Sequence, residues 1–119
     1  MNWTLDKNRP ICPQICQQLC ARIAAGVFLP QQRLMSVREV ALAAGVNPNT
    51  VQRAFEQLEQ QGVLYSVRGA GWYVAANTDA AHTMQQDLVQ DAVQEFFDKM
   101  HSLGISPEET KSIVKEWQL

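Results

Sequence analysis

The most constraining feature of the sequence is a pair of helix starts with a glycine break between them. Ser-Val-Arg-Glu at positions 36–39 has the pattern of a capping box, in which serine caps the helix and glutamate returns a hydrogen bond. Gly45 breaks this helix. Asn47 then begins another as its N-cap, with Pro48 at the first helical position, where no N–H donor is needed. Two helices joined by a short glycine-containing turn predict a helix-turn-helix.

Periodicity gives each of these two helices one buried face. Apolar residues recur three and four positions apart, which places them on the same side of a helix. The second helix is expected to end at Gly62. The expected buried residues are Val37, Val40, Ala41 and Ala44 in the first helix, and Val51, Ala54, Phe55 and Leu58 in the second.

A further helix is predicted before this pair, over residues 10–25. An isoleucine or a leucine recurs there at every fourth position, and Gly26 ends the pattern. Residues 1–9 form an N-terminal arm in front of this helix. In the arm, Trp3 and Leu5 alternate with polar residues, which is typical of a short strand.

The period changes from helix to strand after Gly62. Residues 63–67 and 72–74 are predicted strands, and Arg-Gly-Ala-Gly at 68–71 is the turn between them. A hairpin this small is not stable alone, so it must pack on the helices. The helix-turn-helix and the hairpin together predict a winged helix.

Two more helices are predicted in the last third of the chain. Residues 75–79 look like a linker, a long helix follows over about 80–103, and Ser-Pro-Glu-Glu at 106–109 begins a short last helix. The fold class is therefore mainly α with a small β-hairpin. We expect a winged helix-turn-helix DNA-binding domain over residues 1–76 and a two-helix C-terminal dimerisation tail over residues 77–119.

The long helix carries two apolar rows, which are more than one short helix can cover. The short helix offers only Ile113, Val114 and Trp117. Leaving the rest in water would expose a larger patch than a monomer usually tolerates. We therefore expect a homodimer, with contacts from Met84, Leu88, Val89, Ala92, Val93, Phe96, Phe97 and Met100.

Charge is divided unevenly between the two predicted regions. The 119 residues carry a net charge of −2, which alone does not suggest a nucleic-acid partner. Residues 1–76, however, hold seven Lys and Arg against four Asp and Glu, whereas residues 77–119 hold three against eight. A basic front and an acidic tail suit a protein that meets phosphate with one end. No apolar run reaches the roughly 18 residues of a membrane span, and no secretory signal is visible, so the cytoplasm is expected.

The outer face of the second helix of the pair carries the side chains that read DNA bases. Counting about 100° per residue, Asn49, Gln52 and Arg53 point outward together, opposite the apolar face. Asn and Gln pair with adenine and Arg with guanine. Asn47 and Thr50 flank them and are placed for phosphate. At the hairpin tip, Arg68 beside Gly69 suits a narrow minor groove.

These residues resemble the GntR family of bacterial repressors. The resemblance covers about residues 10–76, and it implies that Arg38, Ser36 and the wing contact DNA, together with the outer face of the second helix. Three positions depart from the family pattern: Gln31 replaces a usual Gly, Met35 a usual Pro and Cys12 a usual Tyr. The first two are expected to loosen the loop before position 36. The matching residues are Pro10, Ile11, Gln14, Ile15, Gly26, residues 34–38, residues 47–51, Ala54, Phe55, Gln57, Leu58, Glu59, Gly62 and residues 69–71.

The short tail resembles that of the YtrA-like branch of the family. That resemblance implies a repressor that binds an inverted-repeat operator as a homodimer and controls neighbouring transporter genes. Two other functions stay open at this point. One is a winged helix that docks a protein. The other is a ligand sensor with a pocket at the dimer interface, for which the sequence names no effector.

Other candidate sites are weaker. Cys12, Cys16 and Cys20 form one stripe on the first helix, which could bind a metal or sense oxidants, but small apolar side chains beside the core explain it as well. Asp87 and Asp91 belong to a carboxylate stripe that is read as a solvated face. No nucleophile–base pair or nucleotide loop is visible, so neither an enzyme nor a cofactor nor a metal is expected.

Overall fold

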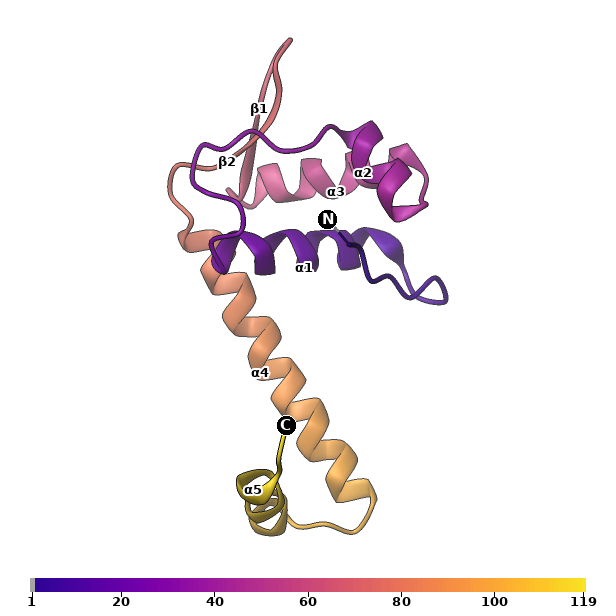
Figure 1. The fold of residues 1–119 in the computed structure, drawn as a ribbon, viewed down its shortest axis with the longest axis vertical. Helices are drawn as coiled ribbons and strands as arrows, with labels where there is room; N and C mark the ends of the chain where they lie inside the picture. The colour runs from indigo at the N-terminus through magenta and orange to yellow at the C-terminus, as the bar shows by residue number, and fades with distance from the viewer. Residues whose placement is uncertain (1) are drawn as a thin grey trace. The chain divides into compact units, whose positions relative to one another are not determined.

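The computed structural model describes residues 2–119, which divide into two compact units, one ending at Gln85 and the other comprising Gln86–Leu119. Five helices and a two-stranded antiparallel sheet make up the described chain (Figure 1). The predicted mainly α fold with a small hairpin is confirmed. In chain order the elements are α1 (Ile11–Ala24), α2 (Val37–Ala44), α3 (Pro48–Gln60), β1 (Leu64–Val67), β2 (Gly71–Val74), α4 (Asp79–Ser102) and α5 (Pro107–Glu116).

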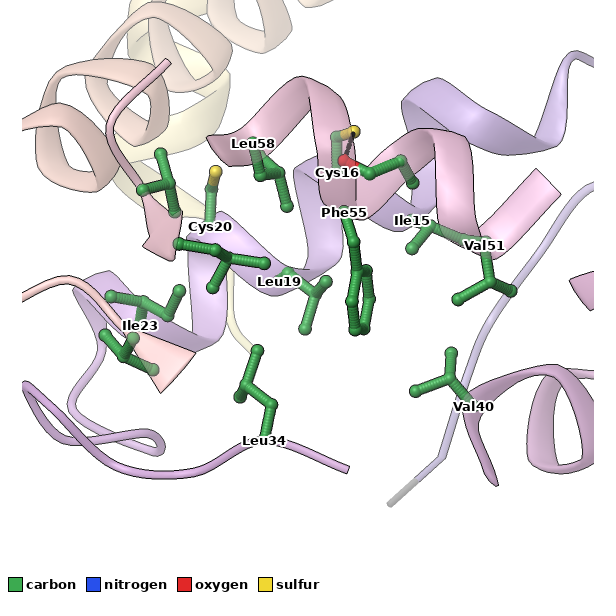
Figure 2. Packing of buried hydrophobic residues seen from close by; sticks show 14 of the residues in the cluster. Ile15, Cys16, Leu19, Cys20, Ile23, Leu34, Val40, Val51, Phe55 and Leu58 are labelled. Carbon is green, nitrogen blue, oxygen red and sulfur yellow. Dashed lines mark hydrogen bonds between the residues drawn. The ribbon is translucent and has the colours of Figure 1, made fainter. Parts of the chain in front are cut away.

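The core of the first unit lies where α1 and α2 pack on α3. Phe55 of α3 is fully buried between side chains of the neighbouring elements, with Leu19 of α1 and Val40 of α2 among them (Figure 2). Burying a side chain of this size contributes on the order of 2 kcal/mol. The periodicity of α3 predicted its buried face correctly. The core residues are Ile15, Cys16, Leu19, Cys20, Ile23, Leu34, Val40, Ala41, Val51, Ala54, Phe55, Leu58, Val63, Leu64, Val74 and Ala81.

The caps that the sequence predicted are present at both helices of the pair. Ser36 Oγ accepts a hydrogen bond from the Glu39 N–H at 3.1 Å, and Glu39 Oε1 accepts one from the Ser36 N–H at 3.2 Å. Gly45 ends α2 with a left-handed φ of 68°, which glycine adopts without steric cost. Asn47 Oδ1 then accepts from the Asn49 N–H at 2.8 Å and begins α3.

The hairpin packs on α3 through an aromatic contact. Residues 64–67 pair with residues 71–74 in an antiparallel register, with Leu64 opposite Val74. The ring of Trp72 meets the ring of Phe55 edge to face, with 5.5 Å between the centroids. Such an arrangement is favourable for aromatic rings. The wing is thereby fixed to the helix that carries the candidate reading face.

The loop before α2 is held more firmly than the sequence suggested. Its backbone runs beside β2, with hydrogen bonds from the Gln31 N–H to the Val74 carbonyl at 2.9 Å and from the Leu34 N–H to the Trp72 carbonyl at 2.8 Å. An antiparallel β-bridge also pairs the backbone of Arg33 with that of Tyr73, so the loop acts as a short third strand. Gln31 keeps the left-handed conformation that a glycine would favour, with φ 66°. The expected loosening is therefore wrong, because backbone pairing compensates for the missing glycine.

The N-terminal arm is not a strand over its described residues, 2–9. It lies along α1, where side chains spaced four apart bond its backbone. Gln18 Nε2 donates to the Thr4 carbonyl at 2.6 Å, and Gln18 Oε1 accepts from the Thr4 N–H at 3.3 Å. The guanidinium of Arg22 lies over the Trp3 ring, 4.7 Å from its centroid. Helix side chains supply the hydrogen bonds that a neighbouring strand would have given.

The start of α4 belongs to the first unit. Ala81 is almost completely buried in its core, and the Cys20 and Met84 sulfurs are 3.6 Å apart. In the second unit, Ser106 caps α5 by accepting from the Glu109 N–H at 3.1 Å. Thr110 is buried there, and its hydroxyl donates to the Ser106 carbonyl. None of the described helices is long and apolar enough to cross a membrane.

Candidate nucleic-acid interface

The outer face of α3 carries polar side chains opposite its buried face. Asn49 and Arg53 are exposed, and Gln52 is half-buried. Gln52 Nε2 donates to Glu56 Oε1 at 2.9 Å, so this amide is held in place from one turn further along the helix. The structure brings the three predicted base-reading residues to one surface, and it adds Glu56 as the partner that orients Gln52.

The N-terminus of α3 adds polar side chains, and not free backbone donors, to this surface. The first N–H groups of a helix have no partner within the helix, and they favour anions. Here Pro48 has no N–H, the N–H of Asn49 is satisfied by the Asn47 side chain, and that of Thr50 is satisfied by the Asn47 carbonyl. The carboxamide of Asn47 still has its NH₂ group for an outside acceptor. Thr50 lies half-buried one turn into the helix. This arrangement suits contact with a phosphate beside the residues that face bases.

Ser36 and Arg38 lie at the start of α2. The capping box fixes the backbone there, and Arg38 extends from the first turn into solvent. The oxygen of Ser36 accepts the bond that caps the helix, while its hydroxyl hydrogen remains available to a phosphate oxygen. The predicted placement of these two residues at an exposed helix N-terminus agrees with the structure.

The hairpin tip exposes Arg68 and Gly69. Gly69 has a φ of 81°, which L residues rarely adopt, and the Ala70 N–H closes the turn on the Val67 carbonyl at 2.9 Å. The glycine is therefore required by the turn itself. Arg68 is the only residue of this tip that carries a charge, and it faces solvent.

Two basic residues near this surface were missed by the sequence reasoning. Arg33 lies over the second wing strand, and a Cβ on Gly71 would be 3.6 Å from its Nε. Lys7 Nζ donates to the Gly45 carbonyl at 2.9 Å, in the turn between α2 and α3. Both contacts join segments distant in the sequence, so local patterns do not indicate them. The only available signal was the positive charge of the first 76 residues.

The three cysteines of α1 are free thiols, and two are part of the core. Burial raises the pKa of the Cys16 thiol from about 9 to about 12, and neighbouring Cys12 and Cys20 add to the shift. Burial also raises the pKa of Cys20 to about 11. Within residues 2–119, no three His, Cys, Asp or Glu side chains are arranged to hold a metal ion. The observed environment fits the interpretation of these cysteines as small apolar side chains.

The second unit exposes apolar side chains on both of its helical segments. Val93 is 50% exposed, Phe96 41% and Trp117 68%. A hollow of about 420 Å³ lies between the helices, lined by Phe96, Met100, Ile113, Val114, Trp117 and Leu119. No charged or hydrogen-bonding side chain lines it except the indole N–H of Trp117. Of the predicted contact residues, Val89, Ala92, Val93 and Phe96 are exposed, and Met84, Leu88, Phe97 and Met100 are half-buried.

Residues 13–74 match the family model described as "Bacterial regulatory proteins, gntR family". Among curated proteins, the chain is 31% identical to the uncharacterized HTH-type transcriptional regulator YhcF of Bacillus subtilis, over 97% of this chain and 95% of that protein. It is also 31% identical to the HTH-type transcriptional repressor YtrA of the same organism, over 90% of this chain and 83% of YtrA.

Solved structures resemble both the whole chain and its front part. A GntR family transcriptional regulator from Listeria monocytogenes matches with a TM-score of 0.82 and 32% identity, over 96% of this chain and all of that one. The DNA-binding domain of AraR in complex with an operator matches with a TM-score of 0.55 and 31% identity, over 63% of this chain and 94% of that one.

Proposed function

The chain belongs to the GntR family of DNA-binding transcriptional regulators, and we propose that it represses transcription as a homodimer bound to an inverted-repeat operator. The family assignment makes it a regulator rather than an enzyme. Repression, the symmetry of the operator and the dimer are the proposed part. YtrA, which is similar along most of its length, is described as a repressor.

The single observation that carries the DNA-binding role is the outer face of α3. Asn49, Gln52 and Arg53 share one side of the helix, next to the polar side chains of Asn47 and Thr50 at its N-terminus. Adenine and guanine are the bases that such side chains bind with two hydrogen bonds each. Arg38 and Arg68 are proposed as phosphate and minor-groove contacts on either side. The similar AraR domain has been solved in complex with an operator, which supports a DNA-binding role for this unit.

The homodimer is proposed from the exposed apolar side chains of the second unit. An isolated chain would leave the side chains of Val89, Val93 and Trp117 at least half exposed to water. Burying several side chains of this size contributes on the order of 2 kcal/mol each, which is enough together to hold two copies. A twofold-symmetric dimer presents two reading helices, and this matches an inverted repeat.

The decisive experiment compares specific with non-specific binding. The full chain is titrated into a duplex that carries the inverted repeat found upstream of the neighbouring genes. A second titration uses a scrambled duplex of equal composition. We expect at least about 10³-fold preference for the repeat, the lower end for specific regulators. Equal affinity for the two duplexes would exclude a sequence-specific regulator.

Variants on α2 and α3 test the residues. Arg53→Ala is expected to reduce preference for the repeat, because a base contact is lost, at a cost of about 1–3 kcal/mol. Arg38→Ala is expected to lower the affinity for both duplexes by the same factor. Lys115→Ala in the second unit is the matched control. Circular dichroism checks that each variant is folded, and unchanged binding by a folded Arg53→Ala protein would remove that residue from the site.

The regulated genes and the alternatives have their own tests. We propose transporter genes beside its own as targets, which requires an inverted repeat upstream of them. A winged helix that docks a protein would retain partner binding in Arg53→Ala and show no preference for the repeat. A ligand sensor would release the repeat when a small apolar compound fills the hollow beside Phe96 and Trp117.

A further inference from the structure

The N-terminal arm ends in a tight turn that carries two more basic side chains. Lys7 and Arg9 are both exposed there. The Arg9 N–H donates to the Asp6 carbonyl at 3.2 Å, and the Asn8 N–H donates to the Asp6 carboxylate at 3.0 Å. The only acidic side chain of the turn is thus engaged by its own backbone, and the side chains of both basic residues remain exposed.

Gln14 of α1 holds this turn in place. Its Nε2 donates to the carbonyls of Asp6 and Pro10, both at 2.9 Å, and its Oε1 accepts from the Asp6 N–H at 2.8 Å. The turn is therefore ordered before any partner arrives. A partner that uses it does not have to supply the free energy of ordering a flexible segment.

The turn lies beside the candidate reading helix. Lys7 Nζ is bonded to Gly45, in the connection that leads into α3, and Figure 1 shows the start of α1 at the same end of the unit as that connection. Pro10, the next residue after Arg9, lines a hollow of about 380 Å³ together with Thr50 and Arg53 of α3. The arm turn thus borders the polar face of α3 from the side of α1.

A helix that enters the major groove has a phosphate backbone on each side of it. Cations that border its N-terminal half therefore face phosphate rather than base edges. Lys7 uses one of its three N–H groups on Gly45 and keeps two. We propose that the arm is a second DNA-contacting element, in which Lys7 and Arg9 bind backbone phosphates flanking the groove read by α3. The proposal rests on the DNA-binding function given above.

Phosphate contacts carry charge but no sequence information, and this fixes what must be measured. Each cation that binds a phosphate releases counterions. The slope of log affinity against log salt concentration therefore changes by about 1 for each such residue removed. A residue that only braces the turn would change affinity without changing this slope. The slope thus separates contact from support.

The test uses the full chain with the repeat duplex and the scrambled duplex, at several salt concentrations. Arg9→Gln and Lys7→Gln are each expected to reduce the magnitude of the slope by about 1, and the double variant by about 2, on both duplexes. Arg9→Lys and Lys7→Arg keep the charge and are expected to keep the slope. Lys115→Gln is the control for removing a lysine in the other unit.

Gln14→Ala is the matched variant for a supporting role. It loosens the turn while leaving both cations, so affinity is expected to fall with little change in slope. If Lys7→Gln proves unstable because the bond to Gly45 is lost, Arg9→Gln decides, since the Arg9 side chain makes no hydrogen bond within residues 2–119. An unchanged slope in folded Arg9→Gln and Lys7→Gln proteins overturns the proposal. If the full chain does not prefer the repeat, the proposed regulator fails, yet the slopes on the scrambled duplex still decide the role of the arm.

Discussion

In the unit that ends at Gln85, Phe55 and Leu19 are 0% exposed, whereas in the unit Gln86–Leu119, Val93 is 50% and Trp117 68% exposed. Both units have well-capped helices, with Ser36 and Ser106 in the same role. The difference therefore lies in packing and not in helix formation. The first unit has completed its core from a single chain.

The comparison teaches that good local sequence signals can produce helices without producing a core. α5 forms because Ser106, Pro107 and the acidic first turn favour it. Its apolar side chains still find too little surface within one chain to cover them. Stability in the second unit is therefore expected to depend on protein concentration, while that of the first is not.

The largest effect is expected from removing the second unit. A chain shortened to residues 1–85 keeps Ala81 and Met84 in the core of the first unit. It should remain folded yet bind the repeat duplex about 10²–10⁴-fold more weakly, because two linked half-sites become one. Titration of the repeat and of a single half-site measures this. Equal affinity of the short and full chains for the repeat would contradict a dimeric role for the second unit.

A smaller effect on the free energy of unfolding is expected to distinguish apolar residues in the core of the first unit from those exposed in the second. Phe55→Ala should lower the free energy of unfolding of the first unit by about 3–5 kcal/mol, because it leaves a cavity in a closed core. Phe96→Ala should cost less than about 1 kcal/mol at high dilution and more as concentration rises. Thermal unfolding at several protein concentrations measures both. A concentration-independent loss in Phe96→Ala would place this residue in an ordinary core.

The matched caps provide the next comparison. Ser36→Ala and Ser106→Ala should each cost about 1 kcal/mol, the usual value for an N-cap. Ser36→Ala should also weaken DNA binding at every protein concentration, since it frees the backbone that positions Arg38, whereas Ser106→Ala should do so only where the proposed dimer dissociates. Chemical denaturation and DNA titration of the two variants check this. The opposite pattern, with DNA binding lost in Ser106→Ala alone, would show that the DNA contacts do not lie in the first unit.

The smallest effect concerns the thiols of α1. Because burial raises the pKa of Cys16 and Cys20, the unfolded chain ionises its thiols first, and stability should fall as pH rises above about 9. A thiol reagent at pH 8 should modify half-buried Cys12 first, and Cys12→Ser should abolish this fast phase. Mass spectrometry identifies the modified peptide. Rapid modification of Cys16 in the folded chain would show that the core opens there.

Much of the fold followed from the sequence because its signals are local. Caps at Ser36 and Asn47 act within three residues, and the apolar face of α3 repeats every turn. The helix bounds were accordingly correct to within a residue or two. The positions of the candidate reading residues followed too, because they are set by the turn of the same helix.

The parts that sequence reasoning missed depend on contacts between distant segments. The arm was expected to be a strand, but its backbone is hydrogen-bonded by Gln14 and Gln18 of α1. The spacing of these two glutamines does not indicate such a contact, because the contact exists only once the arm lies along α1. The contact of Lys7 with Gly45 spans 38 positions. Gln31 was expected to loosen its loop because β2, the strand that pairs with this loop, comes much later in the chain. Backbone pairing of this kind leaves no mark on local composition.

The pairing of residues 31–34 with β2 also sets a fixed length. Leu34 is bonded to Trp72, so the start of α2 and the tip of the wing are two ends of one short ribbon. The distance between the proposed DNA contacts of Arg38 and Arg68 is therefore expected to be the same on every target. Each proposed half-site is expected to require one fixed spacing between these two contacts. Evolution of a new operator would have to preserve that spacing, while the bases under α3 remain free to vary with its side chains.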